Sequence, residues 1–231
     1  MRRPLLLLLA LLALVAAGCG DDEASVGDEG ADTGAQTAPA ETGATASGCE
    51  KAEAPEAKEV SERKRPSFRV ERGTSYTAVL ATSCGTLEVE LAANRAPKTV
   101  SSFVALARED FFDGLAFHRI VPGFVVQGGD PAGTGEGGPG YQVVEAPPSD
   151  LKYERGVVAM AKTEVDKPGT SGSQFFLVTA DDAGLPPDYA LLGRVTKGDD
   201  VLDRLEGVPA DPADGRPTEP VVIEDVEIRE G

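Results

Sequence analysis

Alternation of apolar and polar positions predicts β-strands in the C-terminal two thirds of the chain. In TLEVEL, the apolar residues Leu87, Val89 and Leu91 alternate with polar ones, which is the period of a half-buried strand. The preceding YTAVLAT, which begins at Tyr76, predicts a strand on the other side of a Thr-Ser-Cys-Gly turn. EDVEIRE, near the C-terminal end, predicts a last alternating strand.

Short apolar runs predict further strands that are mostly buried. FHRIVPGFVVQ, residues 117–127, predicts a strand, a Pro-Gly turn and a second strand. We expect buried strands also in GVVAMAK (156–162), SQFFLVT (173–179) and ALLGRV (190–195).

Helical periodicity occurs in only two places. Pro97 suits a first helical turn, and the apolar positions that follow it have the i, i+3, i+4, i+7 spacing: Val100, Phe103, Val104 and Ala107. VLDRLEG, residues 201–207, predicts a second, short helix. Many short strands, two modest helices and Gly/Pro-rich loops favour an antiparallel barrel over a sheet of βαβ units.

The first 18 residues are typical of an export signal. Arg2 and Arg3 precede an uninterrupted apolar run from residue 5 to residue 17, whereas a membrane-spanning helix needs about 20 residues. The following AAGCG resembles the lipobox of bacterial lipoproteins, in which the cysteine is diacylated and becomes the mature N-terminus. We therefore expect lipidation at Cys19, although Ala16 stands where Leu is commoner. An ordinary signal peptide and a plain transmembrane anchor are the alternatives.

Residues 19–65 have the composition of a disordered acidic tether. Residues 20–65 carry 12 acidic and 5 basic side chains and no aromatic residue. Such a segment buries too little apolar surface to offset the entropy of ordering. The formal net charge of the whole chain is −17, and no basic patch is visible, which argues against a nucleic-acid partner.

Two cysteines remain once Cys19 is assigned to a lipid. In an oxidising compartment Cys49 and Cys84 can form a disulfide, which would hold the end of the tether against the barrel and order part of residues 49–75. The alternative is two free thiols, one in the tether and one in the turn between the first two strands.

Several catalytic motifs are absent or lack their structural context. Gly133, Gly135 and Gly138 match G-x-G-x-x-G, but Pro139 follows and no helix is predicted there. His118 is the sole histidine, so neither a serine triad nor a metal site has its partners. On its own, His118 is better explained as a packed, hydrogen-bonded strand residue than as a general base.

Taken together, four segments resemble the cyclophilin-type peptidyl-prolyl isomerases. FHRIVPGFVVQGGD, GVVAMAK, GTSGSQFF and YALLGRV occur in the order and approximate spacing of that family. The resemblance covers about residues 74–231, so we assign residues 66–231 to the isomerase domain. It implies a mainly β fold, an eight-stranded antiparallel closed barrel capped by two helices. It also implies isomerisation of X-Pro bonds in a groove on the outside of the barrel.

The resemblance implies a role for each residue of that groove. Arg119 would be the catalytic residue, and Gln127 would orient its guanidinium or contact the substrate backbone. Backbone groups at Ala161 and Lys162 would pair with the residue before proline. Phe124, Val125, Phe176 and Leu185 would line the proline pocket. Gly135, Gln174 and Tyr189 would border the groove, and His118 would also belong to the substrate-binding residues.

The chain departs from the commonest family pattern at several groove positions. Gly184 stands where many members have Trp, Tyr189 where His is frequent, and Val125 where Met is common. The segment after Ala161 is longer than usual and begins with Lys162 in place of Asn. These departures put cyclosporin binding in doubt and leave substrate preference open.

The resemblance implies an enzyme that needs no cofactor and no metal. We expect it to act on proline-containing polypeptides outside the cytoplasm and to assist their folding. It would be a monomer that is attached to the bacterial membrane only through its lipid anchor. A non-catalytic module that uses the groove to bind proline segments is the alternative.

Overall fold

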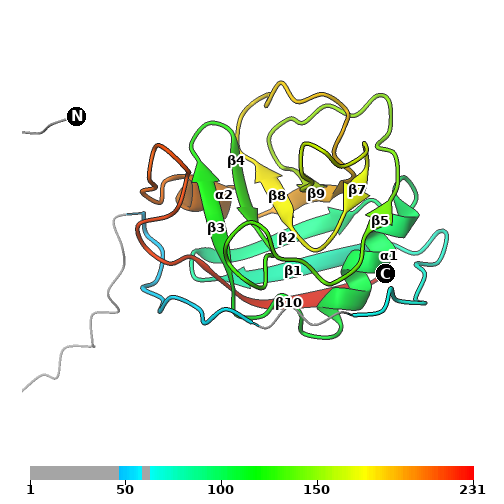
Figure 1. Ribbon diagram of the computed structural model, residues 1–231, viewed down its shortest axis with the longest axis horizontal. Coiled ribbons are helices and arrows are strands. Elements are labelled where there is room, and N and C mark those ends of the chain that lie inside the picture. The colour runs from blue at the N-terminus through cyan, green and yellow to red at the C-terminus, as the bar shows by residue number, and fades with distance from the viewer. Residues whose placement is uncertain (1–46, 59–62) are drawn as a thin grey trace, which may run out of the picture. The chain divides into compact units, whose positions relative to one another are not determined.

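The computed structural model describes residues 47–58 and 63–231, which contain ten strands and two helices (Figure 1). The expected signal, Cys19 and the first part of the expected tether lie outside these residues, so the division of the chain at residues 18 and 65 stays a prediction. In chain order the elements are β1 (Tyr76–Thr82), β2 (Gly85–Leu91), α1 (Pro97–Ala107), β3 (Leu115–Val121), β4 (Val125–Gly128), β5 (Val143–Val144), β6 (Val157–Met160), β7 (Thr170–Ser171), β8 (Phe175–Val178), β9 (Leu191–Lys197), α2 (Asp199–Glu206) and β10 (Val222–Glu230).

Eight of the strands form a closed antiparallel barrel in the order β1-β10-β3-β4-β8-β6-β9-β2. The predicted alternation of β2 is seen in the barrel, because Leu87, Val89 and Leu91 are all buried in the core cluster that fills it. Side chains such as Ile120 and Leu177 fill the interior. The helices lie near opposite ends of the barrel (Figure 1), so the predicted fold is confirmed.

Helix α1 receives its N-terminal cap from a distant loop. Ala96 at the N-cap offers no side-chain hydrogen bond, but the Glu145 carboxylate accepts the backbone N–H groups of Lys98 and Thr99, at 3.2 Å and 2.8 Å. A carboxylate at this end also complements the helix dipole. Pro97 occupies the first turn, as the sequence predicts.

The pair β5–β7 was not predicted. It consists of two residues in each strand, with Val143 opposite Ser171 and Val144 opposite Thr170. A two-residue strand is too short for a period-two pattern to be recognised, and its partner is far away in the sequence. This small sheet lies beside the cavity described below, which Thr170 of β7 lines.

The N-terminal strap, which we define as residues 47–58 and 63–75, follows the outside of the barrel. A disulfide joins Cys49 to Cys84, which confirms that pairing, and Glu50 N donates to Ser83 O beside it at 2.6 Å. Further along, the backbone N–H groups of Lys58 and Arg63 donate to the carbonyls of Pro131 and Pro139, at 2.8 Å and 3.2 Å. The strap is therefore attached at several points along its length.

Neither α1 nor α2, the helices of the described ranges, has the length and apolar character needed to cross a bilayer.

Candidate functional site

The outer face of β4, β6 and β8 carries a second hydrophobic cluster, distinct from the barrel interior. Successive residues of a strand point to opposite faces, so Val126 and Leu177 point into the barrel while Val125 and Phe176 point outward. Partly buried side chains extend the outer cluster to the edge of the barrel: Phe124, Ala161, Leu185 and Tyr189. An apolar surface of this kind, with polar groups beside it, is typical of a binding site.

Strand register places Arg119 in a row of side chains across the outer face. Arg119 of β3 lies opposite Gln127 of β4, Gln127 lies opposite Phe176 of β8, and Phe176 lies opposite Ala159 of β6. Neighbouring positions of this kind lie about 5 Å apart and share a face. The row therefore presents a guanidinium, an amide, a phenyl ring and a methyl group side by side.

Within the described residues, the Arg119 guanidinium has no hydrogen bond and no ion pair. Its stem is nevertheless held in place, because a Cβ at Gly215 would meet Arg119 Cγ at 3.0 Å. The carbonyl of Gly215 also accepts the backbone N–H of Ile120 at 2.7 Å. The 211–216 turn thus supports the arginine stem and leaves the charged end available to a ligand.

Gln127 binds another amide and does not orient the guanidinium in this structure. Its Nε2 donates to Gln174 Oε1 at 2.9 Å. Nε2 of Gln174 in turn donates to the carbonyls of Gly135 and Gly137, at 2.9 Å and 2.8 Å. The first alternative for Gln127, a direct hydrogen bond to Arg119, is therefore not seen; contact with a substrate backbone stays a prediction.

Asp130 organises the loop that borders the site, and the sequence analysis missed it. Its side chain is only 1% exposed, and its carboxylate accepts the backbone N–H groups of Ala132 and Thr134, at 2.8 Å and 2.9 Å, and that of Gly135. An Asp before a Pro- and Gly-rich stretch is a known turn signal, and it was the available clue. Asp130 thereby fixes the Gly135 carbonyl that receives Gln174.

His118 is packed in the strand but is not hydrogen-bonded, which corrects the sequence expectation. Neither ring nitrogen has a partner among the described residues, and a Cβ at Gly135 would lie 3.8 Å from its Nε2. Burial lowers the pKa of the imidazole below its usual value; the Asp130 charge opposes this effect, whereas Arg119 and Arg216 lower the pKa further. The ring is therefore neutral at pH 7.

A further wall of the site is built around Tyr189, which packs against the outer hydrophobic cluster. Its ring packs edge-on against Phe176, with the ring centres 5.4 Å apart. Its backbone is held by Tyr153, whose hydroxyl donates to Tyr189 O at 2.7 Å and accepts Tyr189 N–H at 3.0 Å. Burial raises the pKa of Tyr153 to about 12, so this hydroxyl stays protonated and can donate.

A cavity of about 680 Å³ opens beside this row of side chains. Among the predicted residues it brings together Gly135, Gln127, Ala161, Lys162 and Gln174. The predicted residues of the proline pocket, Phe124, Val125, Phe176 and Leu185, belong to the outer hydrophobic cluster, as does Tyr189 of the predicted groove border. The structure thus collects the predicted residues on one face of the barrel, with His118 beneath Gly135.

Backbone groups just after the end of β6 are available for pairing. The N–H of Ala161 donates to Gln174 O at 2.9 Å. In the described part of the chain, the carbonyl of Ala161 and the N–H of Lys162 have no such partner. No cluster of three or more His, Cys, Asp or Glu side chains in the described ranges could hold a metal ion.

Comparisons with known proteins agree on one family. The sequence model of the family described as "Cyclophilin type peptidyl-prolyl cis-trans isomerase/CLD" matches residues 77–228. The chain is 39% identical over 170 residues to the probable peptidyl-prolyl cis-trans isomerase A of Mycobacterium leprae, which covers 66% of this chain and 91% of the relative. It is also 39% identical over 167 residues to peptidyl-prolyl cis-trans isomerase B of Streptomyces anulatus, covering 64% and 94%.

A solved structure shows the same fold. The crystal structure of a cyclophilin type peptidyl-prolyl cis-trans isomerase from Cryptosporidium parvum in the presence of the dipeptide Ala-Pro superposes with a TM-score of 0.62 at 33% identity. The match covers 67% of this chain and 99% of that structure.

Proposed function

The chain belongs to the family of cyclophilin type peptidyl-prolyl cis-trans isomerases, and we propose that it isomerises X-Pro bonds of polypeptides outside the cytoplasm and assists their folding. One observation carries the proposal. The guanidinium of Arg119, which has no partner among the described residues, stands on an apolar face in register with Gln127 and Phe176. A proline-containing substrate for this chain is also consistent with the related structure from Cryptosporidium parvum, which was determined in the presence of Ala-Pro.

The reaction needs a group that stabilises a twisted amide. Rotation about a peptide bond is opposed by roughly 18–20 kcal/mol, because the nitrogen lone pair is delocalised into the carbonyl. As the X-Pro bond twists, the lone pair returns to the proline nitrogen, which becomes a better hydrogen-bond acceptor. The Arg119 guanidinium, as donor, then favours the twisted state over both planar states, which is differential transition-state binding.

The remaining residues would hold the substrate. Phe124, Phe176 and Leu185 offer an apolar pocket for the proline ring. The Ala161 carbonyl and the Lys162 N–H can pair with the residue before proline, as an added strand pairs with a sheet edge. The ring is held still while the carbonyl side rotates, so neither a nucleophile nor a covalent intermediate is required.

We place the enzyme on the outer face of a bacterial membrane, attached through lipid on Cys19. The basic and apolar leader and the AAGCG sequence support this location. The Cys49–Cys84 disulfide is consistent with it, because such bonds persist in oxidising compartments. We expect the protein to be a monomer.

Turnover of a short proline peptide by the purified protein tests the activity. We expect Arg119→Ala to lower kcat/KM by roughly 10²- to 10³-fold, the usual effect of removing one transition-state donor. Arg119→Lys should restore little, because an ammonium lacks the planar fork of a guanidinium. Both variants should unfold at nearly the wild-type temperature, since in the described part of the chain the guanidinium has no hydrogen bond or ion pair to lose.

Arg216→Ala serves as the control, because it removes an exposed arginine near the site whose side chain, within the described ranges, is paired with Asp214 alone. It should keep its turnover. Near-normal turnover by Arg119→Ala would contradict the proposed role. A wild-type protein that binds proline peptides but does not isomerise them would support the non-catalytic alternative.

A further inference from the structure

Lys162 is almost fully enclosed, although it stands at the start of an exposed loop. Its side chain is only 5% exposed, whereas its ion-pair partner Asp188 is 38% exposed. Residues 163–168, which we call the 163–168 loop, are otherwise mostly exposed. A lysine ammonium leaves water at a high cost unless its donors are satisfied. Its burial here therefore depends on specific partners.

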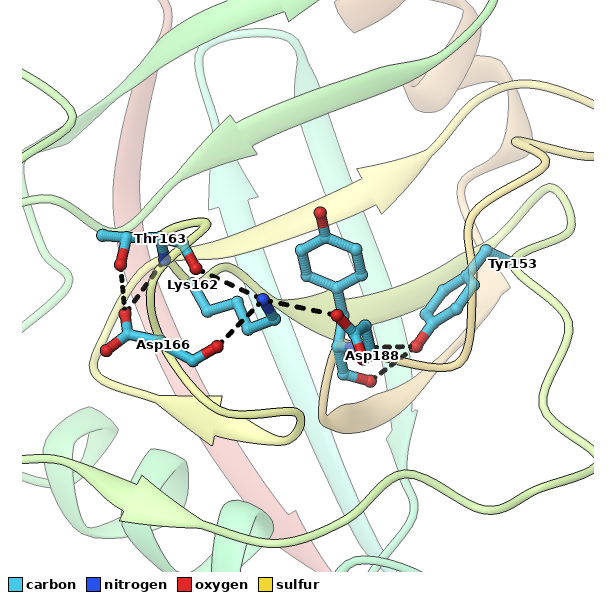
Figure 2. Close-up of polar contacts among 6 residues, drawn as sticks. Tyr153, Lys162, Thr163, Asp166 and Asp188 are labelled. Atoms are coloured by element: carbon cyan, nitrogen blue, oxygen red, sulfur yellow. Dashed lines mark hydrogen bonds and ion pairs between the residues drawn. The ribbon is translucent and has the colours of Figure 1, made fainter.

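Three oxygen atoms from two segments surround the ammonium (Figure 2). Nζ of Lys162 donates to Thr163 O at 3.2 Å and to Asp166 O at 3.3 Å. It also forms an ion pair with Asp188 Oδ2 at 3.5 Å and lies 5.5 Å from the centre of the Tyr189 ring. An ammonium has three donors, and these three oxygens can use all of them. We call this arrangement the lysine clamp.

The lysine clamp joins two segments that are each already ordered. The Asp166 carboxylate closes the 163–168 loop by accepting the backbone N–H and the hydroxyl of Thr163, at 3.0 Å and 2.7 Å. On the other side, Asp188 and Tyr189 form the end of the connection before β9. Lys162 and a backbone hydrogen bond from Gly169 N to Asp188 O, 2.7 Å long, connect the two.

Both segments face the proposed groove. Tyr189 contacts the pocket floor through Phe176, and Lys162 itself carries one of the two backbone groups that are available to the residue before proline. Because Nζ is engaged by the clamp, it is not free to attract an acidic substrate residue. The contribution of this side chain must therefore be to geometry and not to charge recognition.

We propose that Lys162 is a positioning residue that sets substrate affinity by holding the groove edge against the Tyr189 wall. This inference rests on the proposed isomerase function. Without the ammonium, the 163–168 loop and the Asp188–Tyr189 segment lose one of these two connections and keep the Gly169–Asp188 backbone hydrogen bond. Only a fraction of the molecules then hold the backbone of Ala161 and Lys162 in the geometry that binds a peptide. The apparent affinity for the peptide is reduced in proportion to this fraction. Bond rotation depends on Arg119 and is preserved.

The test is a split between KM and kcat in matched variants of the full chain. Lys162→Met keeps the apolar stem and removes the ammonium, and we expect KM for a proline peptide to rise about tenfold while kcat stays within about twofold. Lys167→Met is the control, because Lys167 lies in the same loop and its side chain forms no ion pair or hydrogen bond within the described residues. Its KM should be unchanged.

The partner gives a second, independent variant. Asp188 is at the surface, so Asp188→Asn should fold, and it should raise KM in the same direction. Combined with Lys162→Met it should add little further effect, because the two changes break the same contact. The N–H of Gly169 should exchange with solvent faster in both variants and at the wild-type rate in Lys167→Met.

The outcomes distinguish this inference from the proposed function. An unchanged KM in Lys162→Met and Asp188→Asn, or a fall in kcat alone, would overturn the role of the clamp. An inactive wild-type protein would instead refute the isomerase function. In that case, titration with a proline peptide followed by NMR tests the role of the clamp separately. Weaker binding by Lys162→Met than by Lys167→Met supports this role, and equal binding overturns it.

Discussion

At the scale of single residues, His118 and Asp130 show how a loop and a strand fit together beside the site. Gly135 belongs to the loop that the Asp130 carboxylate organises, and the His118 imidazole lies beneath it. The imidazole has no hydrogen-bond partner within the described ranges. A ring that is enclosed in this way is more stable when it is neutral. Protonation of His118 is therefore opposed by folding.

The stability of the protein should depend on His118 near neutral pH. The pKa of His118 is lower in the folded than in the unfolded protein, so the unfolded state binds the proton first as the pH falls below about 6.5. We expect the free energy of unfolding to be retained above that pH and to fall as the pH is lowered from about 6.5 to about 5.5, a range in which ordinary carboxylates stay ionised. Denaturant unfolding at a series of pH values measures this loss.

His118→Asn is the matched variant, because it keeps a polar side chain that does not titrate. As the chain has no other histidine, the variant should show a flat stability between pH 7 and pH 5.5. The same slope in both proteins would assign the pH dependence to other groups.

The site residues differ in how far they could be predicted. Arg119, Gln127 and Phe176 lie in one row because period-two strands and their register place them so, and the motifs contained them. The partner of Gln127 could not be predicted, because Gln174 is 47 residues away and an amide can bond in many directions. The contacts of the Lys162 ammonium could not be predicted either, because a lysine in an acidic, Gly/Pro-containing loop is normally solvated.

At the scale of elements, the N-terminal strap is the part that lies before the family match, which begins at residue 77. Its attachment combines the disulfide, backbone hydrogen bonds to the 131–139 loop and the packing of Phe68 and Val70 against the barrel core. The strap therefore reaches the loop that borders the groove from its outer side.

Loss of the disulfide should destabilise the protein and loosen the strap. The bond closes a loop with a sequence separation of 35, for which the chain-entropy estimate is at most about 4 kcal/mol. We expect Cys49→Ser, Cys84→Ser and the double variant to lose a similar 2–4 kcal/mol in denaturant unfolding. Hydrogen exchange should be faster at Glu50, which donates to Ser83 beside the bond.

Chemical labelling checks the pairing directly. Thiol alkylation of unreduced wild-type protein should leave Cys49 and Cys84 unlabelled, and reduction should expose both. Label on both cysteines before reduction would contradict the bond. A double variant that is as stable as the wild type would show that the strap is held by its other contacts.

The elements that could be predicted were those with a repeated pattern or a sufficiently long apolar run. Strand β2 and the helix after Pro97 follow alternation and helical periodicity, and β3, β4, β6, β8 and β9 follow apolar runs, whereas β5 and β7 have two residues each and neither signal. The strap has no pattern at all. Its acidic, Ala-rich composition suggested disorder up to residue 65, and only the cysteine argument suggested that part of it is tied down.

At the scale of the whole molecule, the chain combines a formal charge of −17 with an expected lipid anchor. We expect the wild type to incorporate a fatty acid at Cys19 and to fractionate with membranes, because two acyl chains anchor a protein far more firmly than one. Cys19→Ser should be recovered as a soluble or unprocessed protein. Metabolic labelling and fractionation measure both properties.

Cys84→Ser is the control for this experiment, because it also removes a cysteine but leaves Cys19 in place. It should keep both the label and the membrane fraction. A wild-type protein that is found only in a soluble, unlabelled form would rule out the lipoprotein assignment.

Closure of the barrel also governs how the protein behaves among unfolded chains. In an open sheet, the outermost strands present rows of free N–H and C=O groups that recruit other extended chains and seed aggregates. Here β1 pairs with both β10 and β2, and the remaining barrel strands likewise have a neighbour on each side. An extended chain thus finds no strand of the barrel to pair with. Within the described residues, the available backbone at Ala161 and Lys162 is a short stretch, and we expect it to be too short to template a fibre.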